Sequence, residues 1–249
     1  ASAEATGTDV FQYTLTDGDG DESTATLSIN LDGGVTIDAP DAEEAGTIVF
    51  EAGLDGDRTG DVNPESAGSA AGGDTETTAG SITFSGNDTP LSVTIDGVEV
   101  TGVVGQEFQG DEGVLTIVAL NAGSVDYTYT LSDNTSGDAT SDSFAVAVTD
   151  DDGDTANDTL VIDIVDDVAT ARDDTDSLVD DDTAVTGNVV TGVSEAGTGA
   201  ADTQGADGAS VTAFASVNNA QSGPGAVGGV ALAGEFGTLL LASDGTYTY

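Results

Sequence analysis

Two short loops in the sequence carry aspartates at alternate positions around a glycine. The loops are Asp17-x-Asp19-Gly20-Asp21 and Asp150-x-Asp152-Gly153-Asp154. Alternate carboxylates in a turn can point into one concavity, and the glycine permits the positive φ that brings backbone carbonyls to the same point. Such an oxygen set suits Ca²⁺ best, because Ca²⁺ accepts roughly six to eight oxygen ligands at flexible geometry. The spacing therefore predicts a calcium site in each loop. The competing interpretation is a plain hairpin with solvated aspartates, since Asp-Gly is a common turn pair.

The residue types that are missing exclude most other chemistries. The chain contains no Cys, His, Met or Trp, and its two basic residues are both Arg. Disulfides, thiol nucleophiles, imidazole bases, Schiff-base lysines and soft-metal ligand sets are therefore excluded. A carboxylate glycosidase needs an acid and a base held at a fixed separation in a cleft, whereas these aspartates lie in repeated turns. We expect no enzymatic activity.

The balance of charge indicates that cations are the main dissolved partners. There are 47 acidic residues against only Arg58 and Arg172, which gives a formal charge of −45 at pH 7. Self-repulsion on this scale opposes compaction and excludes nucleic acid and anionic membrane surfaces as partners. No run of about 20 apolar residues is present, so we expect no membrane insertion by this segment. Two alternatives stay open: intrinsic disorder without metal, and the unspecific acidic surface of a halophile, which sodium or potassium would stabilise as well as calcium.

The elements that position the loops are predicted to be strands. Apolar residues alternate with polar ones in short runs bounded by Gly, Asp, Asn and Thr, which is typical of half-buried antiparallel strands. Phe11, Tyr13 and Leu15 share one face of the strand before the first loop, and we expect most aromatic residues in the core. Further strands are expected at 25–31, 48–50, 81–84, 91–95, 98–101, 114–120, 125–131, 144–148, 160–164, 210–217, 238–241 and 246–249. So many short strands predict an all-β chain of antiparallel β-sandwiches.

The sequence also repeats itself. Residues 9–29 align without gaps on residues 142–162, so that Asp17 corresponds to Asp150 at an offset of 133 positions. A second repeat joins residues 113–131 to residues 237–249, with a Gly-x-Leu strand, a turn and then Tyr-Thr-Tyr. These offsets indicate a circularly permuted window on a tandem array of domains.

The repeat predicts the domain organisation. Residues 1–36 are expected to form the C-terminal hairpin of a preceding sandwich plus a linker, and residues 37–168 a complete immunoglobulin-like sandwich. Residues 169–249 are expected to be the N-terminal part of another sandwich, completed by residues equivalent to 1–31 of the next copy. A sandwich without its last two strands exposes a long sheet edge, so a neighbouring copy is expected to cover it, by covalent continuation or by strand donation.

Sandwich topology extends the predicted metal sites to the domain junctions. In an immunoglobulin-like sandwich the final hairpin turn lies at the same end as the domain's own N-terminus. The second loop is therefore expected to face the junction that carries Asp32, Asp38 and Asp41. The first loop is expected to serve the domain begun in the preceding copy. The acidic residues at that junction are Asp166, Asp167, Asp173 and Asp174.

The residues resemble the tandem repeats of RTX-type bacterial surface adhesins. The run EEAGTIVFEAGL, the strand YTYTLSDN and the close TDDDGDTANDTLVIDIVDD are similar to the type I secretion target repeat. The runs TGNVVTG, GADGASVTAF and GTLLLASDGTYTY, with DVFQYTLTDGDGDESTATLSI, are similar to VCBS and cadherin-like repeats. The resemblance implies immunoglobulin-like and cadherin-like sandwiches in an elongated array, Ca²⁺ at the Asp-rich loops and linkers, type I secretion, and an extracellular location at the cell surface.

The expected function follows from these points together. The chain is expected to be a calcium-rigidified extender, or stalk, of a secreted adhesin that serves adhesion and biofilm formation. Its partners would be neighbouring copies of the same repeat, end to end. The alternative is a subunit of a self-assembling extracellular filament whose chains are joined by strand donation.

Overall fold

The all-β prediction is confirmed. The computed structural model of the chain describes residues 7–31, 33–56, 67–86, 89–135, 137, 139–178, 184–218 and 221–249. Asp32 and Arg58 lie outside the described residues. The strands pair in antiparallel sheets, and the helical elements of the described residues are two 3₁₀ turns, η1 (Glu51–Gly53) and η2 (Asp74–Glu76). No helix in this part of the chain is long and apolar enough to cross a bilayer.

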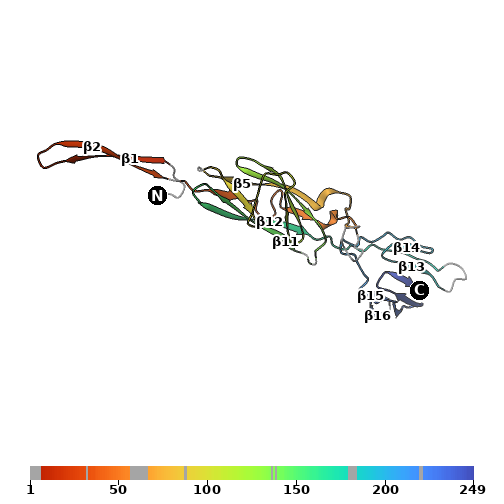
Figure 1. The fold of residues 1–249 in the computed structure, drawn as a ribbon. Helices are drawn as coiled ribbons and strands as arrows, with labels where there is room; N and C mark the ends of the chain where they lie inside the picture. Colours follow the sequence, from red (N-terminus) through yellow and green to blue (C-terminus); the bar gives the residue numbers. More distant parts are fainter. Residues whose placement is uncertain are drawn as a thin grey trace. The chain divides into compact units, whose positions relative to one another are not determined.

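The first element is a hairpin of two ten-residue strands, β1 (Gly7–Thr16) and β2 (Glu22–Leu31), drawn in red in Figure 1. Phe11 lies opposite Leu27 and Tyr13 opposite Ala25, so these apolar side chains share one face as expected. That face is not in a core. Phe11 is 53% exposed and Leu15 65% exposed, because among the described strands β1 and β2 pair only with each other.

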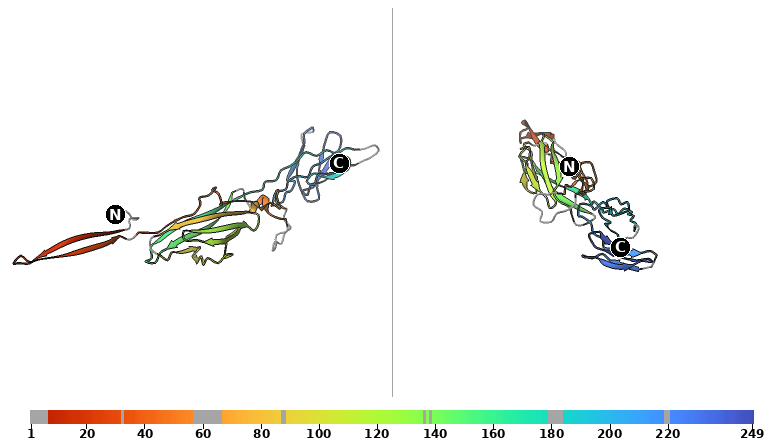
Figure 2. Two further views of the ribbon diagram at one scale, coloured as in Figure 1. Left: turned by 90° about the horizontal axis from the view of Figure 1, so that it is seen from above. Right: turned by 90° about the vertical axis from the view of Figure 1, so that its right-hand side faces the viewer.

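Two five-stranded sheets follow, which can be traced in orange to green in Figure 2. The first has the order β3-β5-β10-β9-β8, with β3 (Thr36–Asp38), β5 (Thr77–Ser85), β10 (Ser124–Leu131), β9 (Gly113–Leu120) and β8 (Glu107–Gln109). The second has the order β4-β12-β11-β6-β7, with β4 (Ile48–Phe50), β12 (Thr155–Val165), β11 (Thr140–Thr149), β6 (Ser92–Ile95) and β7 (Val98–Glu99).

These two sheets pack face to face as a β-sandwich. Alternate residues of β9, β10 and β11 are buried, as a period of two requires for a strand with one face in a core. The ring of Tyr129 in β10 meets the ring of Phe144 in β11 edge-on, with 6.1 Å between centroids. Both side chains are 0% exposed, so this aromatic contact lies in the centre of the core.

The last part of the chain has a smaller core. Its larger sheet has the order β14-β13-β19-β18-β17, with β13 (Thr186–Asn188), β14 (Val193–Ser194), β17 (Val230–Ala233), β18 (Thr238–Leu241) and β19 (Thr246–Thr248). A separate two-stranded sheet pairs β15 (Ala213–Ser216) with β16 (Gln221–Pro224). Leu232, Leu241 and Tyr247 are buried, while Phe236 is 87% exposed.

Tyrosine rings lie directly over glycines both in the β-sandwich and in the last part of the chain. A Cβ atom added to any of these glycines would overlap the ring or hydroxyl above it. The pairs are Gly80 with Tyr127, Gly113 with Tyr129, Gly187 with Tyr247, and Gly237 with Tyr249. The second and fourth pairs are equivalent in the repeat of residues 113–131 and 237–249, and they show that this repeat folds alike in both copies.

The described chain divides into two compact units. The first contains residues 1–48, 78–130 and 141–163, and the second contains residues 49–77, 131–140 and 164–249. The boundaries predicted at 36/37 and 168/169 stay predictions.

Candidate cation-binding turns

The two Asp-rich loops adopt the same turn. In each, the first aspartate donates its N–H to the carbonyl of the third, at 3.0 Å from Asp17 to Asp21 and 3.1 Å from Asp150 to Asp154. The glycine of each turn has φ +100, a conformation that a side chain would strain. The turn between β1 and β2 is therefore a structural copy of the turn between β11 and β12.

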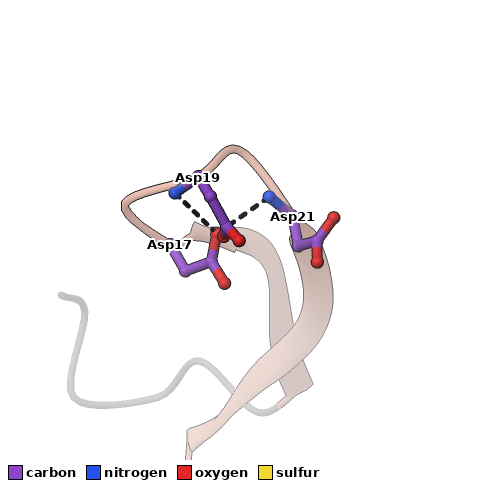
Figure 3. A group of neighbouring side chains, drawn as sticks. All are labelled: Asp17, Asp19 and Asp21. Atoms are coloured by element: carbon purple, nitrogen blue, oxygen red, sulfur yellow. Dashed lines mark hydrogen bonds between the residues drawn. The ribbon is translucent and has the colours of Figure 1, made fainter.

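The first aspartate of each turn is held by backbone N–H groups. Oδ1 of Asp150 accepts hydrogen bonds from Gly153 (3.1 Å) and Asp154 (2.7 Å). Oδ1 of Asp17 accepts hydrogen bonds from Asp19 (3.2 Å), Gly20 (3.0 Å) and Asp21 (2.9 Å). Figure 3 shows two of these bonds and the three carboxylates gathered over the turn. The turn is thus formed by the chain's own groups, with one carboxylate oxygen of each leading aspartate as the acceptor.

The carboxylates of each triplet lie close enough to share one ion. One ligand oxygen each from Asp17, Asp19 and Asp21 lie within 4.8 Å of one another, and the second triplet has the same property. Like charges at this separation repel, and a bound divalent cation would offset that repulsion. The hydrogen-bonded side chain of Asp19 and the backbone N–H of Asp21 lower the pKa of Asp17.

The second triplet has the more enclosed geometry. Asp150 is only 7% exposed, and its Oδ2 is buried without a hydrogen-bond partner among the described residues. Burial of a carboxylate oxygen without a hydrogen-bond partner destabilises the fold. A cation bound at this oxygen would provide the missing partner and offset that cost. The first triplet is exposed.

The junction residues Asp38 and Asp41 lie elsewhere in the first unit. Asp38 lines a pocket with Pro40 and Glu44. The carbonyl of Asp41 accepts a hydrogen bond from Thr47 Oγ1 at 3.1 Å. Among the described residues, neither carboxylate joins the Asp150 triplet. Their role in a junction site stays a prediction.

The other predicted ligands lie in the second unit. Asp167 accepts two hydrogen bonds from Ser69, one from its N–H at 2.7 Å and one from its hydroxyl. Asp173 and Asp174 line a pocket that also contains Arg172. Oδ1 of Asp174 is buried without a partner in the described part of the chain.

Sequence reasoning missed Glu51, a buried acid in η1. Its side chain is 0% exposed, and Oε1 accepts hydrogen bonds from Thr135 N–H (2.6 Å) and Oγ1 (2.7 Å). Oε2 has no partner among the described residues. Burial raises the pKa of Glu51, the Thr135 bonds oppose that rise, and the charges of Asp207 and Asp166 add to it. Glu51 lies two positions after the buried Val49, and this alternation is the signal that could have marked it as buried.

Sequence reasoning also missed two carboxylates that hold the fold together. Asp142 is 2% exposed and accepts the hydroxyl of Tyr129 at 2.6 Å. Asp176 accepts the hydroxyl of Tyr247 at 2.5 Å. Burial and the Asp176 hydrogen bond raise the pKa of Tyr247 to about 12. These carboxylates accept hydrogen bonds within the protein. Some of the acidic residues therefore serve the fold and are not free to bind dissolved cations.

No protein-family model matches the chain, and no curated protein matches it.

Proposed function

We propose that this chain is a calcium-rigidified extender of an extracellular array of immunoglobulin-like and cadherin-like sandwiches, without catalytic activity. The observation that carries this proposal is the Asp150 turn. It holds three carboxylates within reach of one ion, and Oδ2 of Asp150 is buried with no hydrogen-bond partner in the described part of the chain. Ca²⁺ is the cation that best suits such a ligand set of carboxylate oxygens in a flexible turn.

Calcium at such turns would contribute directly to folding. A site whose ligand is present at about a hundredfold its dissociation constant adds about 2.7 kcal/mol to the free energy of unfolding. Extracellular modules bind Ca²⁺ with constants on the order of 10⁻⁴ to 10⁻³ M. The chain would therefore stay loosely folded where calcium is scarce and stiffen outside the cell, which suits secretion to the cell surface for adhesion and biofilm formation.

The partners proposed for the array are further copies of the same repeat. In the middle sandwich β11 pairs with β6 and covers the core. The β1–β2 hairpin repeats β11–β12 in sequence and turn geometry, and its apolar face is exposed. In residues 169–249, β15 and β16 precede β17, β18 and β19 in the chain as β6 and β7 precede β8, β9 and β10, and among the described residues they form a separate two-stranded sheet. The hairpin of one copy would complete that sheet in a neighbouring copy.

The second candidate is a filament subunit joined by strand donation between separate chains. The exposed apolar face of β1–β2 favours it, because a donated hairpin needs such a face before it docks. The mass of the native material under denaturing conditions separates the two candidates. One very long chain supports a tandem adhesin, and a subunit near the sequence mass supports a polymer.

The test of the calcium proposal is thermal unfolding of the full chain with Ca²⁺ and with excess chelator. We expect a large drop in Tm in chelator, and heat of binding when Ca²⁺ is added back in a calorimeter. A chain that binds no Ca²⁺ and melts at the same temperature in both conditions would overturn the proposal.

A further inference from the structure

The turn between β8 and β9 binds a carboxylate within the middle sandwich. Asp142 of β11 accepts backbone hydrogen bonds from Asp111 (2.8 Å) and Glu112 (3.2 Å) through Oδ1. Its Oδ2 accepts from Glu112 (3.2 Å) and Gly113 (3.0 Å), and also from the hydroxyl of Tyr129 (2.6 Å). Both oxygens of one carboxylate are therefore satisfied by three consecutive N–H groups and one phenol.

The turn between β17 and β18 has the same construction. The N–H of Gly234 bonds to the carbonyl of Gly237 at 2.7 Å, as the N–H of Gly110 bonds to that of Gly113 at 2.8 Å. The ring of Tyr249 lies over Gly237, with the hydroxyl 2.7 Å from a Cβ built there. This turn of residues 234–237 is hereafter the receiving turn.

No carboxylate bonds to the receiving turn in the described part of the chain. Among the described residues, the N–H groups of Glu235, Phe236 and Gly237 and the hydroxyl of Tyr249 have no acceptor. A Cβ built on Gly110 would overlap the Asp142 carboxylate. One built on Gly234 meets, within 4 Å, only the carbonyl oxygen of Gly237 at 3.4 Å. The space that Asp142 fills in the middle sandwich is thus open at the receiving turn.

The residue that matches this space is in the hairpin. Asp9 of β1 corresponds to Asp142 of β11, and Phe11 corresponds to the buried Phe144. Asp9 lies opposite Ile29, on the same face as the exposed apolar side chains of the hairpin. A hairpin laid on a neighbouring copy by its apolar face would carry the Asp9 carboxylate with it.

We infer that the Asp9 carboxylate of a second copy binds the receiving turn, accepting the N–H groups of residues 235–237 and the Tyr249 hydroxyl. The inference rests on the proposed pairing of the hairpin with a neighbouring copy. This polar contact would fix the register of the hairpin against the neighbouring copy, because a shift by one residue would turn Asp9 to the other face of the hairpin. The apolar face supplies affinity, and the carboxylate selects the position.

The test is self-association of the full chain in saturating Ca²⁺, followed by sedimentation velocity. Asp9→Asn should weaken association about tenfold or more, since an amide nitrogen would face N–H donors that need an acceptor. Tyr249→Phe should weaken it several-fold. The matched control is Glu22→Gln, which removes one charge from the other face of the same hairpin. None of the three should change the Tm of the dissociated chain, because the polar groups they alter form no hydrogen bond with the described residues.

Mixing the variants gives a second readout. Each contact pairs residue 9 of one chain with residue 249 of another, so a mixture of the two variants offers four combinations. One of them is native: Asp9 of a Tyr249→Phe chain with Tyr249 of an Asp9→Asn chain. At a concentration where neither variant associates measurably alone, the mixture should form one-to-one pairs through this native contact.

The outcomes distinguish failure of the Asp9 contact from failure of the pairing between copies. Association that is unchanged by Asp9→Asn and Tyr249→Phe, or weakened equally by Glu22→Gln, overturns the contact while the pairing of copies stands. Wild-type chains that do not associate at all overturn both the pairing and the contact. Calcium binding is measured separately by the melting experiment.

Discussion

Asp17 and Asp150 each use one carboxylate oxygen to hold the turn, and each lies in a triplet of carboxylates whose ligand oxygens are within 4.8 Å of one another. A turn built in this way forms before any ion arrives, so binding costs little chain entropy. The same arrangement leaves the apo turn with uncompensated repulsion. Calcium affinity and local stability are therefore coupled at these residues.

Substitution of Asp150 tests that coupling. Asp150→Asn keeps an oxygen for the backbone but places an amide group where Oδ2 now lies, so calcium affinity at this turn should fall about tenfold or more. The gain in Tm on adding Ca²⁺ should shrink accordingly. Asp151→Asn is the matched control, because it lies in the same turn outside the triplet. Equal effects of the two substitutions would show that charge alone, and not ligation, is responsible.

Glu51 supplies a pH-dependent prediction. Its folded pKa is raised above the ordinary 4.5, so the unfolded chain loses this proton first as pH rises. Stability from this group is fully present below 4.5 and is lost as pH rises through the folded pKa. Glu51→Gln should therefore be more stable than wild type at neutral pH in chelator and equal to it in acid.

Denaturant midpoints against pH measure this difference. The exposed Glu99 provides the control, since Glu99→Gln should shift the midpoint little at any pH. A wild-type chain that stays as stable as Glu51→Gln across neutral pH would contradict the buried-charge explanation.

Sequence alone was sufficient for the two aspartate triplets and insufficient for the structural acids. The triplets are local, because residues 17–21 and 150–154 each form their own turn. Glu51, Asp142 and Asp176 instead meet partners that are 84, 13 and 71 positions away. Composition and spacing carry no signal for such distant pairs.

At the scale of elements, the two repeated hairpins have different surroundings. β11 lies in a five-stranded sheet with Phe144 fully buried, whereas β1 pairs only with β2 among the described strands. Similar local sequence thus produces the same hairpin twice, and the burial of its apolar face differs between the two hairpins.

A matched pair of substitutions measures this difference. Phe144→Ala should lower the free energy of unfolding by about 3–5 kcal/mol, because it empties the centre of a core. Phe11→Ala should change it by less than about 0.5 kcal/mol in the dissociated chain. Denaturant unfolding at low protein concentration gives both values. A large loss for Phe11→Ala under these conditions would show that β1 packs within its own chain.

Most strands could be predicted from the sequence, and the exceptions share a cause. Alternation located 48–50 and 238–241 with the observed bounds, and 125–131 within one residue. It missed strands of two to four residues, namely β3, β8, β13, β14, β16 and β17. Strands this short form through pairing with a neighbouring strand.

At the scale of the whole molecule, a charge of −45 requires counter-ions, which either screen the chain diffusely or bind at specific sites. Diffuse screening would depend on ionic strength alone. Site binding would depend on the identity of the cation.

Melting the chain in NaCl and CaCl₂ at matched ionic strength distinguishes these cases. We expect about 1 mM Ca²⁺, near the constants of extracellular modules, to raise Tm well above the value in the matched NaCl solution. Magnesium at the same concentration should be less effective, because its rigid octahedral shell fits a flexible turn poorly. Equal protection by sodium would instead favour the unspecific acidic surface.

The tyrosines that rest on glycines affect how this chain can change over generations. In each pair the two residues depend on each other. A methyl group on the glycine would displace the tyrosine ring, and loss of the ring would expose the strand to water. Neither half can be altered without the other, so these positions should vary together while the rest of the surface drifts. The spacing of these Gly and Tyr residues would then still be recognisable in the sequences of distant repeats after the acidic loops had diverged.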